Sequence, residues 1–294
     1  MNVLAEPFAF EFFRQGLLAA TLVGALCGMI GVYVILRRMS YIGHGLSHSV
    51  FGGAVVAYVA SINFYVGAGL WGFLSALLIN ATARRGKVGA DAAIGIVTTA
   101  SFAIGVALIS KTRSFTRDFE AALFGNVLGV TPTDLVVVGA TTALVAVFIV
   151  AFYKPLLFLT FDPDVAPIFG VRTGVVDTLF SLALAATIVA SINVVGVTLI
   201  AATLVIPSST ARMLTDSFGR MIVYSTLLGA GSGLVGIYLS YWLDVSSGAT
   251  IVLLEAAIFV VVSLVVWVLQ RQTPWERDHQ PRVVAASESP SDTR

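Results

Sequence analysis

The sequence has few charged residues. Asp, Glu, Lys and Arg together make up 11% of the 294 residues, against about 25% in an average soluble domain. Hydrophobic residues make up 57%, and the mean hydropathy is +0.94. A water-soluble fold of this length could not bury so many apolar side chains. The composition therefore excludes a soluble enzyme and a disordered protein, and it predicts a polytopic integral membrane protein.

Three other features are scarce or missing. The chain has one cysteine, Cys27, which excludes an intrachain disulfide and hence a disulfide scaffold. The net charge of +1 favours neither nucleic acid nor an acidic partner. No Gly-x-x-x-x-Gly-Lys-Ser/Thr segment occurs, so the sequence lacks a nucleotide-binding P-loop. If the protein moves a solute at the expense of ATP, another chain must hydrolyse the nucleotide.

Long apolar runs, by contrast, are abundant. Windows of about 20 apolar residues mark membrane-spanning helices. They predict an all-α membrane helix bundle of about nine spans, at about 16–36, 45–61, 64–83, 91–110, 133–153, 174–192, 195–213, 219–242 and 247–270. We expect residues 1–271 to form the transmembrane domain. The polar, proline-containing stretch 272–294 is expected to be a disordered cytoplasmic tail.

Basic residues orient these spans, because short loops rich in Lys and Arg stay in the cytoplasm. They follow alternate spans, at Arg37, Arg38, Arg84, Arg85, Lys87, Lys154, Arg172, Arg212, Arg220, Arg271, Arg277 and Arg282. Alternation then places the N-terminus outside and the C-terminus in the cytoplasm. Only the loop 111–117 departs from the rule.

Two connecting segments are unusual. Residues 119–130 are too few to span a bilayer and too apolar for a solvated loop, so we expect them to lie in the interface or to re-enter the membrane. The cytoplasmic stretch 161–173 carries Asp162 and Asp164 before a short apolar run that ends at Gly170. Acidic residues at the start and glycine at the end predict a short capped helix over about 161–172.

Two of the three histidines, His44 and His48, lie four residues apart. On a helix, residues i and i+4 share a face, so both imidazoles can point at one metal ion. The alternative is that both are neutral and hydrogen-bonded to Ser47, Tyr41 or a backbone carbonyl. A zinc-protease site is disfavoured, because no glutamate follows His44 as a general base.

Among the acidic residues within predicted spans, three are assigned roles from their positions. Asp91 begins the fourth span and is expected to cap it. Asp177, near the start of the sixth, is expected to pair with Arg172 or to stabilise the helix start. Glu255 lies eight residues beyond Ser247, too deep to cap a helix. It is either functional or a protonated acid that bonds to a neighbouring helix.

Four stretches of the chain are distinctive when they are taken together. They are residues 37–48 (RRMSYIGHGLSH), residues 93–110 with their continuation to 128, residues 161–171 and residues 195–214. With residues 247–252 they cover the chain from about 16 to 270. In this order they resemble the permease subunits of the zinc, manganese and iron ABC importer family.

The resemblance implies a homodimeric or pseudo-dimeric permease in the plasma (inner) membrane of a prokaryote, served by cytoplasmic ABC ATPase subunits and an extracytoplasmic metal-binding protein. The chain is then a translocation subunit rather than an enzyme, with no permanently bound cofactor and with Zn, Mn or Fe as its cargo. The family has an aspartate and a histidine, four residues apart, in its metal site. His48 matches that histidine, whereas His44 stands at the place of the aspartate. Four imidazoles from two copies suit zinc, whereas carboxylate oxygens favour manganese.

The resemblance also suggests roles for other candidates. The stretch 161–171 looks like the family's coupling helix, which sits in a groove of the ATPase, and Asp162, Asp164 and Gly170 match its pattern. We expect Val165 and Phe169 to take part in this docking. Glu255 is a further metal-site candidate, as an outer ligand or relay, although the family pattern does not obviously demand an acid there.

Two other functions stay open from the sequence. An importer of metal chelates of the siderophore or cobalamin kind could have a similar coupling loop, but it would need a wide lumen and no protein-only metal site. A membrane-embedded metal enzyme would use His44 and His48 for a catalytic or structural metal, and it would turn over substrate without an ATPase.

Overall fold

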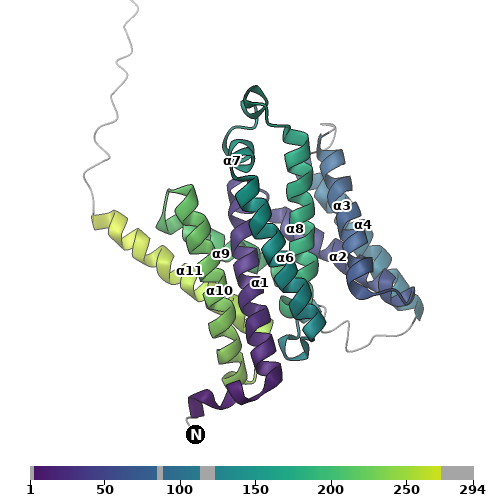
Figure 1. Cartoon of the computed structure of the whole chain (residues 1–294), viewed down its shortest axis with the longest axis vertical. Coiled ribbons are helices and arrows are strands. Elements are labelled where there is room, and N and C mark those ends of the chain that lie inside the picture. The colour runs from purple at the N-terminus through teal and green to yellow at the C-terminus, as the bar shows by residue number, and fades with distance from the viewer. Residues whose placement is uncertain (1–2, 85–88, 113–122, 273–294) are drawn as a thin grey trace, which may run out of the picture.

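The computed structural model describes residues 3–84, 89–112 and 123–272, and the regular structure within these ranges is helical (Figure 1). The longer helices are α1 (Glu11–Leu36), α2 (Ser40–Val59), α3 (Phe64–Arg84), α4 (Ala90–Thr112), α6 (Pro132–Ala151), α8 (Thr173–Val195), α9 (Ile200–Leu214), α10 (Phe218–Leu243) and α11 (Ser247–Gln272). The shorter ones are η1 (Val3–Ala9), η2 (Val127–Gly129), α7 (Tyr153–Phe161) and η3 (Ala166–Phe169).

Each predicted span corresponds to one of the longer helices, which confirms the all-α membrane bundle. Within the described ranges, seven helices are long and apolar enough to cross a membrane. The two predicted spans outside this set are α9, which has 15 residues, and α2, which is rich in Ser, Gly and His. Neighbouring helices cover much of both, so their surfaces need not match lipid. The predicted tail, apart from Gln272, lies outside the described residues.

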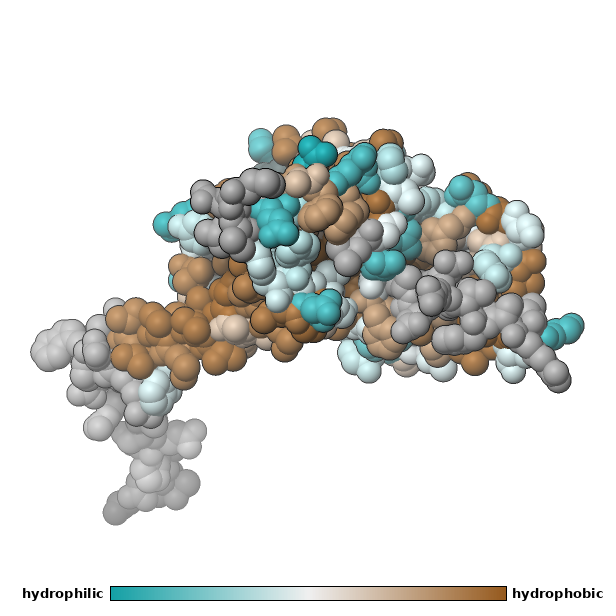
Figure 2. Space-filling view, turned by 90° about the horizontal axis from the view of Figure 1, so that it is seen from below, coloured by the Kyte–Doolittle hydropathy of each residue, from teal (hydrophilic) through white to brown (hydrophobic). Residues whose placement is uncertain are grey.

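The helices fall into three groups (Figure 1). Helices α2, α3 and α4 pack together on one side, and α9, α10 and α11 pack together on the other. Helices α1, α6 and α8 lie between these groups, and α1 packs most extensively against α10. Helix α11 projects from the body, and Figure 2 shows its surface as largely hydrophobic. A surface of this kind is compatible with lipid or with another membrane helix.

Small residues allow the close packing of α1 against α10. A Cβ atom at Gly24 would collide with the backbone carbonyl of Gly229, and one at Gly229 would collide with that of Gly24. One turn along α1, the hydroxyl of Ser225 donates a hydrogen bond of 2.6 Å to the carbonyl of Gly28. Two small residues facing each other let helix backbones approach closely in a membrane protein.

The connection between α6 and α8 differs from the sequence prediction. The run 133–153 was expected to be one helix followed by a loop, but α6 ends at Ala151 and α7 begins at Tyr153. The backbone at Phe152 (φ −102°, ψ 19°) separates them. Apolar residues continue through this break, so hydropathy alone does not reveal it.

The described part of the predicted re-entrant segment, residues 123–130, packs against the connection between α8 and α9. The backbone N–H of Asn126 donates to the carbonyl of Asn193 (3.0 Å), and that of Thr198 donates to the carbonyl of Leu123 (3.3 Å). Gly125 and Gly196 have positive φ angles of 79° and 90°, and their backbones touch. A side chain would be strained at either position.

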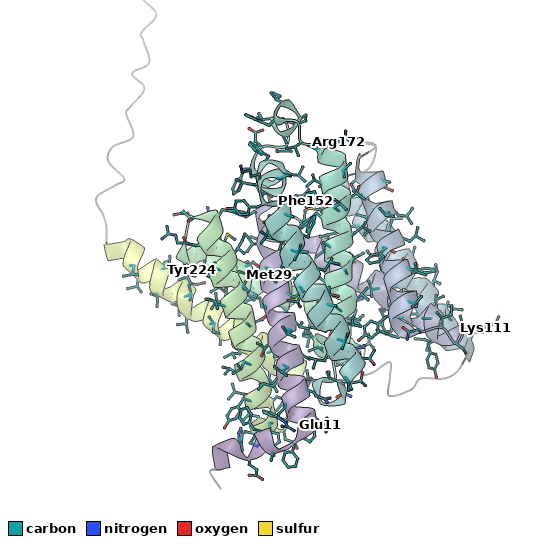
Figure 3. All side chains as sticks on the ribbon, viewed as in Figure 1. Glu11, Met29, Lys111, Phe152, Arg172 and Tyr224 are labelled. Atoms are coloured by element: carbon teal, nitrogen blue, oxygen red, sulfur yellow. The ribbon has the colours of Figure 1, made fainter. Side chains whose placement is uncertain are left out.

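The two ends of the bundle carry different groups of residues (Figure 3). Glu11 and Lys111 lie at one end, whereas Arg172 and Phe152 lie toward the other. Spans that cross the membrane in alternate directions require this arrangement, because they place the N-terminal segment and the loop after Lys111 on the same, outer side.

Candidate functional site

Helix α2 follows α1 through a short, hydrogen-bonded turn. Helix α1 ends at Leu36, and the backbone N–H of Met39 donates to the carbonyl of Val34 (2.9 Å). Arg38 takes a positive φ of 54° in this turn. Helix α2 therefore begins at Ser40, earlier than the predicted start near residue 45, and includes both histidines.

The two histidines lie side by side on one face of α2. The centroids of the His44 and His48 rings are 4.6 Å apart, and the ring planes are inclined by 80°. His44 is exposed and His48 is partly buried. Nδ1 of His48 is buried and has no hydrogen-bond partner in the described structure, and Ser47 donates to the backbone carbonyl of His44 rather than to a ring. Within the described residues, Nδ1 of His48 is thus not held by a hydrogen bond, as it would be in a purely structural histidine.

Helix α4 sets the position of this face. The ring of His48 packs edge-on against Phe102 of α4, with centroids 5.1 Å apart. Gly45 lies against Ile94 and Thr98, and a Cβ atom at Gly52 would collide with the backbone carbonyl of Ser101. Neither Gly45 nor Gly52 was predicted from the sequence to matter for this face. Their spacing of seven residues, two helical turns, places both on the α4 side of α2.

Two imidazoles do not complete a metal site by themselves. Structural zinc sites use four protein ligands and catalytic ones use three. Within the described ranges, no three His, Cys, Asp or Glu residues come together in a way that could hold a metal. Because His44 is exposed, its ring is open to ligands from a second chain.

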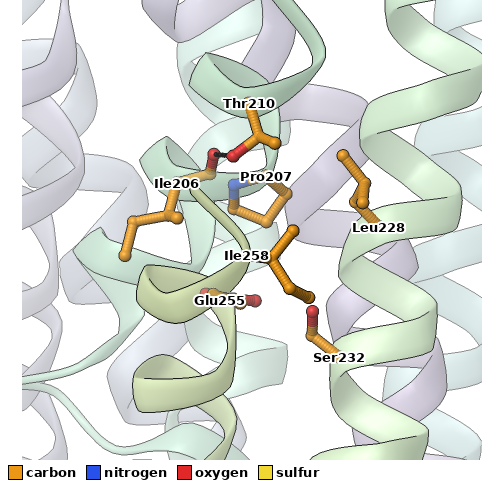
Figure 4. A pocket seen from close by; sticks show the side chains of 7 residues that line it. All are labelled: Ile206, Pro207, Thr210, Leu228, Ser232, Glu255 and Ile258. Atoms are coloured by element: carbon orange, nitrogen blue, oxygen red, sulfur yellow. Dashed lines mark hydrogen bonds between the residues drawn. The ribbon is translucent and has the colours of Figure 1, made fainter. Parts of the chain in front are cut away.

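Glu255 lies in a different place, among α9, α10 and α11 (Figure 4). It is 2% exposed, and neither carboxylate oxygen has a hydrogen-bond partner in the described structure. Pro207 and Ser232 line the same narrow space, which does not admit a water molecule. The hydroxyl of Ser232 is also buried without a partner there. The structure does not place Glu255 beside the histidines.

The other two acidic candidates, Asp177 and Asp91, lie near the starts of α8 and α4. Asp177 forms an ion pair with Arg37 at the end of α1, rather than with the expected Arg172. Asp91 is exposed and lies in the first turn of α4, which begins one residue earlier than predicted.

A buried acid, Asp134, was not predicted from the sequence as a site residue, and it is 8% exposed. Its Oδ2 accepts hydrogen bonds of 2.7 Å from both the backbone N–H and the hydroxyl of Thr131. Its Oδ1 accepts from the hydroxyl of Tyr65 and, at 3.2 Å, from Nδ2 of Asn193. These bonds tie α3, α6 and α8 together at one end of the bundle. The Thr-x-x-Asp capping pattern at residues 131–134 was the available signal.

The predicted coupling helix is a short 3-10 turn. Oδ1 of Asp162 accepts a hydrogen bond from the backbone N–H of Val165 (3.1 Å), and Gly170 ends η3 with a φ of 75°. Asp164 is exposed. Phe169 is 64% exposed and stacks on Phe158, with ring centroids 5.0 Å apart.

The end of this turn presents apolar side chains outward. Ile168, which the sequence analysis did not name, is 81% exposed, whereas Ala166 is buried. Val165 is partly buried. Ala166 thus anchors the turn, and Ile168 and Phe169 form its exposed apolar tip.

Comparison with known proteins identifies the family. The model of the ABC 3 transport family matches residues 9–266. The manganese transport system membrane protein MntC of Halalkalibacterium halodurans is 40% identical over 254 residues, which cover 86% of this chain and 87% of that protein. A probable iron transport system membrane protein of Haemophilus influenzae is 36% identical over 258 residues, covering 88% and 95%.

A solved structure agrees with these sequence relatives. The structure described as PsaBC from Streptococcus pneumoniae in complex with Fab matches with a TM-score of 0.79 and 32% identity, over 88% of this chain and 94% of the other. The match to the family model includes α2 with its histidines and the turn η3, and it runs through nearly all of the helical bundle. The chain belongs to the ABC 3 transport family.

Proposed function

We propose that this chain is the transmembrane permease of an ATP-driven importer that passes a divalent metal ion, manganese, iron or zinc, into the cytoplasm. The relatives named for manganese and iron transport support this cargo class. The observation that carries the proposal is the adjacent pair His44 and His48 on an outward face of α2, with ring centroids 4.6 Å apart. Imidazole nitrogen binds all three of these metals, and most tightly zinc.

A second copy of the chain would complete the site. Two copies related by a dimer axis at the exposed face of His44 would bring four imidazoles together. Four nitrogen ligands satisfy a tetrahedral ion without bound water. Because a transporter must also release its ion, we expect moderate rather than very tight binding.

Partner chains would supply the energy and deliver the ion. The chain has no P-loop, so ATP hydrolysis belongs to separate cytoplasmic ABC ATPase subunits. The exposed apolar tip of η3, with Phe169, supports a docking contact with them, together with Asp162, Asp164, Val165 and Gly170. An extracytoplasmic binding protein would present the ion at the opposite end of the bundle, with the N-terminus on that side and the tail in the cytoplasm.

Glu255 has a separate role in this proposal. Its position among α9, α10 and α11 supports a relay or outer ligand that the ion meets when these helices move. An unpaired carboxyl group is costly inside a membrane protein and usually marks a functional position. In the described conformation it is closed off from water.

Uptake by proteoliposomes tests the function. The permease, its ATPase and the binding protein are reconstituted, and uptake of radiolabelled manganese, iron and zinc is measured with and without ATP. We expect ATP-dependent uptake by the wild-type complex and none by His48→Ala, while the variant still assembles with the ATPase. His279→Ala, which alters the third histidine, is the matched control and should transport normally. Normal uptake by both His44→Ala and His48→Ala would show that the histidine pair is structural.

A further inference from the structure

An ion pair joins the end of α1 to the start of α8. Nη2 of Arg37 contacts Oδ1 of Asp177, and the side chains are 11% and 28% exposed. The guanidinium carbon of Arg37 also lies 4.8 Å from the ring centroid of Phe180, one turn further along α8. A partly buried guanidinium held by a carboxylate and by an aromatic ring has a defined orientation. In this conformation the pair therefore joins the end of α1 to the start of α8.

On one side, this pair is connected to the proposed docking turn. The backbone N–H of Val171 donates to the carbonyl of Ala166 in η3 (3.1 Å), and that of Val176 donates to the carbonyl of Arg172 (3.1 Å). Only Gly170, Val171 and Arg172 separate η3 from α8. A displacement of η3 therefore passes into the first turns of α8, where Asp177 lies.

On the other side, the ion pair is connected to α2, the helix that carries His44 and His48. Arg37 is the first residue after α1, and the turn to α2 is closed by hydrogen bonds from Met39 to Val34 and from Ile42 to Met39, both of 2.9 Å. His44 follows Ile42 by two residues. Moving Arg37 thus moves the start of α2.

The pair also has room to rearrange. Arg37, Asp177, Met39 and Ile42 line a cavity of about 200 Å³ that extends to Asn80 of α3. Nη1 of Arg37 has no hydrogen-bond partner in the described structure. Because the guanidinium has several N–H donors, Nη1 can bind a new partner in this space while Nη2 keeps its contact with Asp177.

We propose that Arg37 and Asp177 form the link through which the ATPase, docked at η3, moves the histidine pair on α2. This inference rests on the proposed function, since it requires an ATPase at η3 and a metal ion at α2. In this role Arg37 and Asp177 are positioning residues and touch neither partner nor cargo. The link joins positions 140 residues apart in the sequence.

A double-mutant cycle tests the link. Arg37→Gln and Asp177→Asn each remove one charge while keeping most of the side-chain volume. In each variant, the ATP hydrolysis that manganese and the binding protein stimulate should fall about tenfold. Loss of a coupling free energy between two sites typically has an effect of this size. Basal ATP hydrolysis and manganese binding should stay at wild-type values. The double variant Arg37→Gln/Asp177→Asn should be no worse than either single variant, because both lose the same contact.

Matched controls separate this link from general effects. Arg38→Gln and Arg172→Gln remove neighbouring exposed arginines and should keep stimulation. Because the double variant leaves no unpaired buried charge, it should assemble even if a single variant does not. Wild-type stimulation in the double variant, or additive losses from the two single variants, would overturn the link. Failure of the wild-type complex to transport any metal would instead overturn the proposed function.

Discussion

Gly52→Ala should impair transport by moving α2, which carries His44 and His48, away from α4. The added methyl group would lie 2.8 Å from the carbonyl carbon of Ser101, whereas ordinary contacts of this kind are 3.4–4 Å. This distance is about 0.6 Å shorter than the shortest ordinary contact. A shift of that size exceeds the roughly 0.5 Å within which the residues of a binding site must be held. Backbone atoms cannot rotate out of the way, so α2 and α4 must separate. Phe102 follows Ser101 and holds the ring of His48, so the histidine loses its support.

Two measurements give this prediction its magnitude. Overpacking costs about 1–3 kcal/mol, and the gain in helix propensity from Gly to Ala returns up to about 1 kcal/mol. The free energy of unfolding should therefore fall by about 0–3 kcal/mol. Loss of a supporting contact typically costs metal sites about 10–100-fold in affinity, so manganese uptake at low concentration should fall at least about tenfold.

The matched control is Gly139→Ala in α6, where an added methyl group meets no atom within 4 Å. This variant should be equally stable or slightly more stable, and it should transport at the wild-type rate. Wild-type uptake and metal affinity in Gly52→Ala would refute the reasoning that α4 positions the histidines.

Three further predictions concern selectivity, coupling and orientation. His44→Asp should keep transport but shift preference from zinc toward manganese in competition uptake, because an oxygen ligand replaces a nitrogen; an unchanged ratio would exclude His44 as a ligand. Replacing Val165 and Phe169 with glutamate should abolish stimulated ATP hydrolysis and leave metal binding intact, and normal coupling would place the docking surface elsewhere. Ser291→Cys should react with an impermeant maleimide only from the cytoplasmic side, with buried Cys27 silent in the parent chain; labelling from outside would reverse the proposed topology.

The helices were predictable because hydropathy is a local property. Every predicted span became a helix, and the spacing of His44 and His48 correctly placed both rings on one face. The break at Phe152 was not predictable, because apolar residues continue on both sides of it. A change of direction inside an apolar run depends on tertiary packing, which the local pattern does not contain.

The polar contacts were harder to predict than the helices. Asp177 was expected to pair with Arg172, five residues away, or to stabilise the helix start, but it pairs with Arg37, which the fold brings from the end of α1. Asp134 was overlooked because it sits near a helix start, where an acid is unremarkable, yet tertiary contacts from Tyr65 and Asn193 bury it. Sequence proximity identifies candidate partners within one helix, whereas pairs between helices follow from the packing.

The composition of α2 bears on how the protein is assembled in the membrane. This helix carries Ser40, Ser47 and Ser49 beside its two histidines, and most of its residues are buried by neighbours. Polar side chains at the centre of a helix oppose its partition into lipid on its own. During synthesis α2 therefore depends on later segments, because α3 and α4 must arrive before its glycine and serine faces are covered. A nascent chain that stops before α4 would hold the histidines against lipid, so α2 is made early but is covered only after α3 and α4 have followed it.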